Sequence, residues 1–153
     1  MIIFISPTEA TQCTEATVCA GAAVPASGQY TSTKCTLSSE QPAFTDCSVP
    51  SSNQYVVIPC VPGDATTIGT DTILGTCSNP VATNEYVITK CVQGDPETSG
   101  SDTVISTCAD PDSTEYTTSV CVNGNYATTG TNTAIASCAV PDSTEYTTSV
   151  CVN

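Results

Sequence analysis

A tyrosine followed five residues later by a cysteine recurs along this chain, and this repeat constrains the fold more than any other feature. The pairs are Tyr30/Cys35, Tyr55/Cys60, Tyr86/Cys91, Tyr116/Cys121 and Tyr146/Cys151. Copies spaced by about 30 residues indicate a tandem repeat, whose units are too small to bury a core alone and must pack against their neighbours. The sequence therefore predicts an array of small units.

Cysteine takes the place of a large hydrophobic core in this chain. The 153 residues include 11 Cys but no Trp, two Phe and one Met. A chain with few large apolar side chains and many cysteines is stabilised by disulfides, which form in an oxidising compartment. Structural zinc is excluded because the sequence has no His and no Cys-x-x-Cys pair. We therefore expect an extracellular or cell-surface protein that holds no metal or cofactor.

The charge of the chain is strongly acidic. It has 15 Asp and Glu against two Lys and Arg, a formal net charge of −13. Binding to nucleic acid or to an anionic membrane surface requires clustered cations, so both kinds of partner are excluded. No apolar stretch is long enough to span a bilayer, and no membrane insertion is expected.

The repeat divides the sequence into five segments. We expect an extended N-terminal segment over 1–18, divergent Cys-rich units over 19–59, and regular repeats over 60–90, 91–120 and 121–153. The last repeat is expected to end part-way into a further unit, because Asp112–Asn123 and Asp142–Asn153 are identical in sequence.

Each regular unit contains two candidate strands. Thr70–Cys77 and Tyr86–Val92 are rich in β-branched and aromatic residues and are bounded by Gly, Pro, Asn and Asp. No stretch shows a helical period. The predicted fold is all-β, with almost no helix: an elongated tandem array of small disulfide-stapled hairpin-like repeats.

The odd spacing between tyrosine and cysteine predicts that the ring and the sulfur lie on opposite faces of an extended strand. One face would carry the disulfide, and the other would present Tyr86 and Ile88 to the next unit. The five tyrosines named above are therefore the predicted residues of packing between repeats.

Two disulfide registers respect the repeat. The first closes each short interval that contains the tyrosine: Cys19–Cys35, Cys47–Cys60, Cys77–Cys91, Cys108–Cys121 and Cys138–Cys151, with Cys13 left over. The second closes the longer intervals: Cys60–Cys77, Cys91–Cys108 and Cys121–Cys138, with Cys35–Cys47 and Cys13–Cys19. We prefer the first register, because its loops are shorter to close.

The N-terminal segment has features of an intermolecular joint. It carries the apolar run Ile2, Ile3, Phe4 and Ile5, and the leftover Cys13 follows it. The run would be a strand that one subunit lends to the next, and Cys13 would form an intermolecular disulfide.

The spacing and composition of these units resemble the cysteine-rich tandem repeats of protist surface proteins, ciliate surface antigens in particular. The half-unit Cys138–Cys151 is also similar to the small modules of tumour-necrosis-factor-receptor-like and ephrin-receptor-like repeats, although those carry more than two Cys per unit. The resemblance implies an extracellular surface protein, and no binding residue is carried over from it.

The sequence contains two weak candidates for chemistry. Asp71 and Asp102 lie in Gly-x-Asp-Thr motifs similar to those of calcium-binding β-rolls, but the motif occurs once per repeat and Asn132 replaces the Asp in the third copy. A turn before a strand is the simpler interpretation. Without His, no Ser/His or Cys/His pair is available, so we expect no enzymatic activity.

Dense threonines are candidate O-glycan acceptors, so glycans are expected as partners. The candidates are Thr117, Thr118, Thr128, Thr129, Thr147 and Thr148.

These features together predict a structural component of an extracellular filament or cell-surface coat that assembles head to tail with itself. The alternative is a monomeric adhesion or receptor ectodomain. It would bind a ligand through the loops in which the repeats differ, namely Asp64–Thr67, Asp95–Thr98 and Asn125–Thr128.

Overall fold

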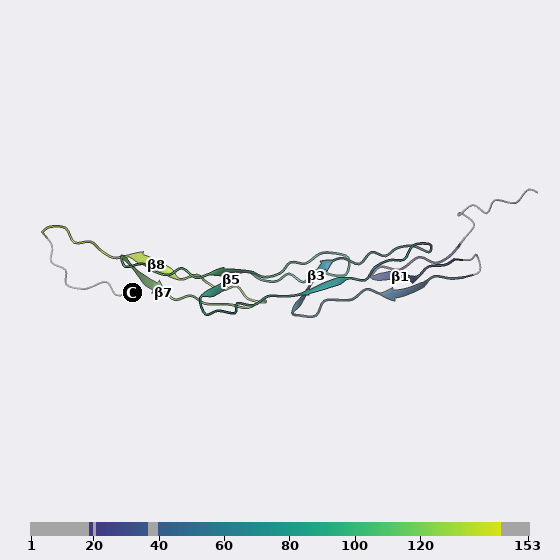
Figure 1. Cartoon of the computed structure of the whole chain (residues 1–153), viewed down its shortest axis with the longest axis horizontal. Coiled ribbons are helices and arrows are strands. Elements are labelled where there is room, and N and C mark those ends of the chain that lie inside the picture. The colour runs from purple at the N-terminus through teal and green to yellow at the C-terminus, as the bar shows by residue number, and fades with distance from the viewer. Residues whose placement is uncertain (1–18, 20, 37–39, 145–153) are drawn as a thin grey trace, which may run out of the picture. The chain divides into compact units, whose positions relative to one another are not determined.

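The computed structural model describes residues 19, 21–36 and 40–144, and these residues contain no helix (Figure 1). They form eight short strands: β1 (Gln29–Thr33), β2 (Ala43–Asp46), β3 (Gln54–Ile58), β4 (Ile73–Thr76), β5 (Glu85–Thr89), β6 (Val104–Thr107), β7 (Glu115–Ser119) and β8 (Ala134–Ser137). The strands make four separate two-stranded antiparallel sheets, β1–β2, β3–β4, β5–β6 and β7–β8. The predicted fold class of small disulfide-stapled hairpins is confirmed.

All four hairpins share one register. In β3–β4, Tyr55 lies opposite Gly75 and Val56 opposite Leu74, and the register then shifts so that Ile58 lies opposite Ile73. The same shift follows the third residue of the first strand in the other three sheets. One extra residue at a fixed place is a β-bulge, which bends its strand and raises its twist.

The bulge corrects the predicted face pattern. Strict alternation between tyrosine and cysteine requires an unbroken strand, but the strand is bulged at Ile88 and ends at Thr89, before Cys91. Ile88 is 50% exposed and does not form the predicted packing face, while its neighbour Val87 is fully buried. The strands are also shorter than predicted, since β4 begins at Ile73 and β5 ends at Thr89.

Packing is confined to a few positions. The largest fully buried side chains are Val56, Val87 and Thr31, which occupy the same place in β3, β5 and β1. The ring of Tyr55 lies against Gly75 of its own hairpin, where an added Cβ would come within 2.8 Å of it. Tyr116 is 39% exposed. The structure thus places the Tyr55 ring across its own sheet.

Four disulfides each enclose the first strand of one hairpin. They are Cys19–Cys35, Cys47–Cys60, Cys77–Cys91 and Cys108–Cys121, the pairs of the first register. Cys138 is also disulfide-bonded, whereas Cys13 and Cys151 lie outside the described residues. Because so few side chains are buried, these bridges carry much of the stability.

The described residues fall into two compact units. Unit 1 holds residues 19, 21–36, 40–47 and 60–71, and unit 2 holds 48–59 and 72–144. No helix long and apolar enough to cross a membrane occurs among the residues described.

Candidate functional site: arms that dock on strand edges

The loops that join the strands of the last three hairpins are built alike, and we call them arms. The first arm is Val61–Thr70, the second is Val92–Ser101 and the third is Val122–Thr131. The first and last residues of each arm form an antiparallel bridge with two backbone hydrogen bonds, 2.8–3.0 Å long. Each arm is therefore a narrow loop closed at its base.

The tip of each arm is closed by the same turn. In the second arm, an Asp95 side-chain oxygen accepts from the Glu97 amide at 2.9 Å, and the Thr98 hydroxyl accepts from the Asp95 amide at 3.2 Å. Asp64 and Thr67 repeat this arrangement in the first arm, as do Asn125 and Thr128 in the third. An Asp or Asn with a Thr three residues later therefore fixes the conformation of the tip, and only the two residues between them vary freely.

These turns lower the pKa of their carboxyl groups. The pKa of Asp64 is lowered by the Thr66 hydroxyl and by the Thr66 and Thr67 amides. The pKa of Asp95 is lowered chiefly by the Glu97 amide. Both carboxylates are fully exposed and remain ionised at neutral pH. Their role is to shape the turn through these hydrogen bonds.

Two glycines let the sides of each arm approach closely. Gly94 has a φ of 71°, and a Cβ on it would lie 2.5 Å from the Thr98 carbonyl oxygen. A Cβ on Gly100 would collide with the carbonyl oxygens of Val92 and Gln93. Gly63 with Gly69, and Gly124 with Gly130, meet the same restrictions. A side chain at these positions would force the arm open.

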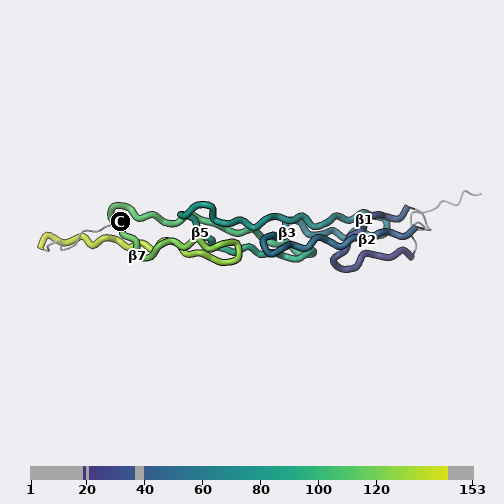
Figure 2. The backbone as a smooth tube through the Cα atoms, turned by 90° about the horizontal axis from the view of Figure 1, so that it is seen from below, coloured from purple at the N-terminus to yellow at the C-terminus, as the bar shows by residue number. Residues whose placement is uncertain are grey.

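Each arm docks on the outer edge of a first strand through two backbone hydrogen bonds. In unit 2, the Val56 amide of β3 donates to the Gln93 carbonyl oxygen, and the Val56 carbonyl oxygen accepts from the Gly100 amide, both at 2.8 Å. Val87 of β5 makes the same pair with Asn123 and Gly130 of the third arm. Figure 2 shows this yellow-green arm alongside β5.

Unit 1 contains the same docking. The Thr31 amide of β1 donates to the Pro62 carbonyl oxygen at 2.8 Å, and the Thr31 carbonyl oxygen accepts from the Gly69 amide at 2.9 Å. The residue that receives the arm is the fully buried one in β1, β3 and β5. We call this residue the acceptor position; the arm pairs with an edge that a two-stranded sheet leaves open.

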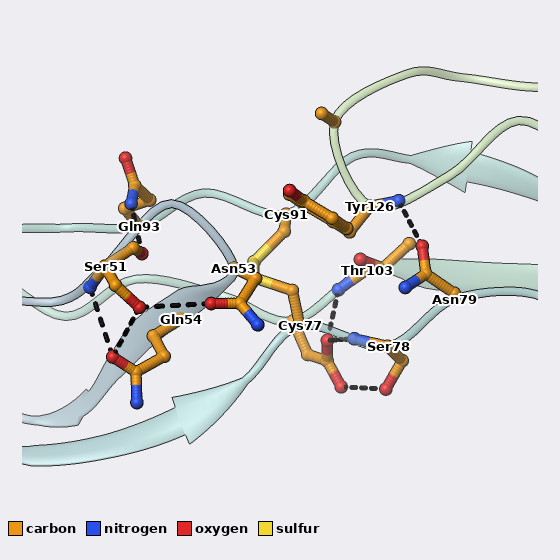
Figure 3. The surroundings of a disulfide bond; sticks show 12 residues. Ser51, Asn53, Gln54, Cys77, Ser78, Asn79, Cys91, Gln93, Thr103 and Tyr126 are labelled. Atoms are coloured by element: carbon orange, nitrogen blue, oxygen red, sulfur yellow. Dashed lines mark hydrogen bonds between the residues drawn. A yellow bond between two sulfur atoms is a disulfide. The ribbon is translucent and has the colours of Figure 1, made fainter.

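Side-chain amides add a second contact in unit 2. Gln93 Nε2 donates to the Ser51 carbonyl oxygen at 2.5 Å (Figure 3), and Asn123 Nδ2 donates to the Ala82 carbonyl oxygen at 2.9 Å. Ser51 and Ala82 stand at equivalent places before β3 and β5. An Asn or Gln in the second place of the arm therefore fixes its register on the acceptor strand.

The arm tips contact the disulfides. The Cys91 amide donates to the Tyr126 carbonyl oxygen at 2.8 Å. The Tyr126 amide in turn donates to Asn79 Oδ1 at 2.8 Å, beside the Cys77–Cys91 bridge (Figure 3). In unit 1 the Cys35 amide donates to the Ala65 carbonyl oxygen at 2.9 Å. In both cases a backbone carbonyl group at the arm tip holds the second cysteine of the disulfide that encloses the acceptor strand.

The calcium candidate Asp102 bonds to protein donors. One carboxylate oxygen accepts from the Ser78 and Thr103 amides, and the other accepts from the Ser78 hydroxyl, all at 2.7 Å. Burial raises the pKa of this carboxyl, but the three hydrogen bonds outweigh burial and lower it. Asn132 accepts from the Ala109 amide at 2.7 Å in the same way. In both repeats a side-chain oxygen directly after the arm accepts from the amide of the residue that follows a cysteine. An Asn can replace the Asp because its amide oxygen accepts this hydrogen bond as well.

Metal binding has no further support in the part of the chain that the structure describes. Asp71 is the other calcium candidate and is half-buried. No three His, Cys, Asp or Glu side chains gather closely enough there to hold an ion.

The O-glycan candidates that are described lie on the surface. Thr117, Thr118, Thr128 and Thr129 are all exposed. The Thr118 hydroxyl donates to the Ala134 carbonyl oxygen at 3.1 Å, and the Thr128 hydroxyl serves the tip turn. Thr147 and Thr148 lie outside the described residues, as do Tyr146 and the predicted joint Ile2, Ile3, Phe4 and Ile5.

Sequence reasoning missed the acceptor position. It is the residue directly after the repeated tyrosine, and it reads Thr31, Val56 and Val87 in β1, β3 and β5. A β-branched residue at that place in each copy was the available signal.

No protein-family model, curated protein or solved structure matches this chain.

Proposed function

We propose that this protein is a non-enzymatic structural component of an extracellular filament or cell-surface coat, built from repeats that join head to tail. The observation that carries the proposal is the arm docked on a strand edge, which occurs on β1, β3 and β5 with the same two backbone hydrogen bonds. Recognition through backbone groups tolerates changes of side chain. A repeat can therefore join any neighbour whose first strand offers the same backbone amide and carbonyl groups at its acceptor position.

The covalent framework supports a place outside the cell. Four disulfides enclose the four first strands, and such bridges persist in oxidising compartments. Exposed Thr118 and Thr129 would carry O-linked glycans there. A sparse core held by disulfides, with a sugar coat, is suited to load-bearing material exposed to proteases.

The joint between subunits is proposed to use the N-terminal run Ile2–Ile5, with Cys13 forming a covalent link. This part of the proposal rests on the sequence alone. A chain that lacks residues 1–6 and still forms intact polymers would show that the joint lies elsewhere.

A second candidate is an adhesion or receptor ectodomain that binds through the arm tips. It is favoured by the side chains of Thr66, Glu97 and Ala127, which differ between arms and are exposed. The backbones of two tips hold the preceding cysteines, so recognition would depend on one or two side chains per tip. Exchange of Pro96-Glu97 for Tyr126-Ala127 would abolish ligand binding under this candidate and leave a filament unchanged.

Electron microscopy of native, non-reduced material tests the proposal. Regular filaments or a sheet with a subunit repeat are expected. Isolated monomers at every concentration would contradict it and favour the second candidate.

A further inference from the structure

We infer that the outer edge of β7 at Thr117 is an open acceptor site for the arm of a further repeat of this type. Thr117 is the acceptor position of the fourth hairpin, directly after Tyr116. Within the residues described, β1, β3 and β5 each carry an arm and β7 carries none.

Exposure separates the occupied edges from the open one. Thr31, Val56 and Val87 are 0% exposed under their arms, whereas Thr117 is exposed. The difference does not come from the hairpin itself, because Thr117 lies opposite Ile135 just as Val87 lies opposite Ile105. The bulge that follows is also the same. The site is therefore preformed and lacks only its occupant.

The open edge of β7 presents backbone hydrogen-bonding groups to an incoming arm. The amide and carbonyl groups of Thr117 point away from β8, since those of an acceptor residue pair with an arm and not with the partner strand. The Asp112 carbonyl oxygen accepts from the Glu115 amide, as the Ala82 carbonyl oxygen accepts from that of Glu85. It is thus placed to accept a second hydrogen bond from an Asn or Gln side-chain amide.

The occupant that fits is an arm with a backbone carbonyl in its second place, preferably on Asn or Gln, and a glycine amide in its ninth. The three arms described already lie on β1, β3 and β5, so they do not supply it. The sequence Cys121-Val122-Asn123 that opens the third arm recurs as Cys151-Val152-Asn153. A further repeat of this kind, not an exchanged arm of a second copy, is the occupant we assign.

The inference rests on the proposed function, because docking of an arm at Thr117 is the contact between repeats by which such an array would be extended. The two can fail separately. Filaments without docking at Thr117 would leave the function standing and remove this joint. Docking at Thr117 without filaments would keep the joint and remove the filament.

Amide hydrogen exchange on a lengthened chain tests the site. A second copy of Gly124–Ser137 is added after Asn153, so that Cys-Val-Asn continues as it does in the third arm. In the 153-residue chain the Thr117 amide should exchange freely, while those of Val56 and Val87 are protected. In the lengthened chain, exchange at Thr117 should slow by about tenfold or more.

Two substitutions at Thr117 sharpen the test. Thr117→Pro removes the donor on the outer edge and leaves the β7–β8 ladder intact, so the added arm should stay unprotected. Thr117→Val restores the residue found at the other unit 2 acceptor positions and should increase protection. The Val87 amide is the internal control and should not change in either variant.

Three results would overturn the inference. The first is a Thr117 amide already protected in the 153-residue chain at high dilution. The second is protection of Thr117 that rises with protein concentration and disappears on deletion of residues 1–6, which would make the N-terminal strand of a second copy the occupant. The third is a lengthened chain whose Thr117 amide exchanges as freely as before.

Discussion

The Val87 amide donates a 2.8 Å hydrogen bond to the Asn123 carbonyl oxygen. This contact joins the strand of one hairpin to the arm of the next, and Val56 makes the same bond to Gln93. A two-stranded hairpin alone is at best marginally stable in water. Addition of an arm as a third, short strand buries Val87 completely, and so it supplies the packing that one hairpin cannot make.

Replacement of Gly100 by alanine should release the second arm from β3. A Cβ on Gly100 would collide with the backbone of Val92 and Gln93. No side-chain rotation relieves this clash, because the position of a Cβ is fixed by the backbone. We expect a loss of about 1–3 kcal/mol of stability and faster amide exchange at Val56 in the Gly100→Ala variant.

Gly28→Ala is the matched control for this variant. Gly28 has a positive φ of 76°, which Gly100 does not, but an added Cβ at Gly28 meets no atom within 4 Å. It should cost only about 1 kcal/mol of backbone strain and leave exchange at Val56 unchanged. Equal effects of both variants on Val56 would contradict the docking argument.

Thr31→Val should stabilise the protein. Thr31 is fully buried, and its hydroxyl has no hydrogen-bond partner among the described residues. Valine has the same shape and occupies this position in β3 and β5. Removal of a buried unsatisfied hydroxyl should gain about 1 kcal/mol, measured as a higher urea midpoint. Val87→Thr should lose a similar amount, and a destabilising Thr31→Val would show that the hydroxyl is satisfied.

The four observed disulfide pairs and the absence of helix from residues 19, 21–36 and 40–144 could be predicted because both follow from spacing and composition. A tyrosine-containing interval such as Cys77–Cys91 is short, and short loops close at lower entropic cost. The β-branched content around Tyr86 likewise left no alternative to a strand. These properties are local, so the sequence favoured the observed register over the one that closes the longer intervals.

The arm and its acceptor could not be predicted in the same way. Docking of Gly100 on Val56 uses a backbone amide and a backbone carbonyl group, which almost every residue supplies, so the β-branched residue at the acceptor position was only a weak signal of it. The bulge at Ile88 was also not predicted, and it interrupts the alternation of faces on which the predicted packing of Ile88 depended. The Gly-x-Asp motif was noticed at Asp102, but its role as a tie to Ser78 depends on a contact made by the fold.

Loss of the Cys77–Cys91 bridge should destabilise unit 2. The two cysteines are separated by 14 residues, and the entropy of closing such a loop is worth about 3 kcal/mol. We expect Cys77→Ala/Cys91→Ala to lower the free energy of unfolding by this amount, as measured by denaturant titration. Both cysteines are changed so that neither is left as a free thiol that could form a new bridge.

A reductant provides the companion measurement. The double variant should lose less stability on reduction than the wild-type protein, because one bridge is already absent. A double variant as stable as the wild-type protein would mean that the arms and the strands hold unit 2 together without the disulfide.

Asp102→Asn should remove part of the acid sensitivity of the protein. The folded pKa of Asp102 is lowered below its ordinary value of 3.8 by three hydrogen bonds that outweigh burial. A lowered pKa contributes stability that is fully present above the unfolded value and is lost as the pH falls through the folded value. Stability should therefore decline below about pH 4 in the wild-type protein, and the variant should lack this share of the decline.

Asn132 shows that the substitution preserves the fold, since its side-chain oxygen accepts from the Ala109 amide just as Asp102 accepts from Ser78. At neutral pH the variant should lose the charge-assisted part of the two amide bonds, and the Ser78 hydroxyl, which now donates to the second carboxylate oxygen, would have to accept from the new Nδ2 instead. Urea midpoints of both proteins at several pH values between 7 and 2 would measure the difference, while Asp64, Asp95 and Asp112, whose pKa values are also lowered, stay the same in both. Parallel pH curves would mean that Asp102 does not couple its ionisation to folding. A gap that narrows toward low pH would show that its carboxylate holds the second arm to the chain after Cys77.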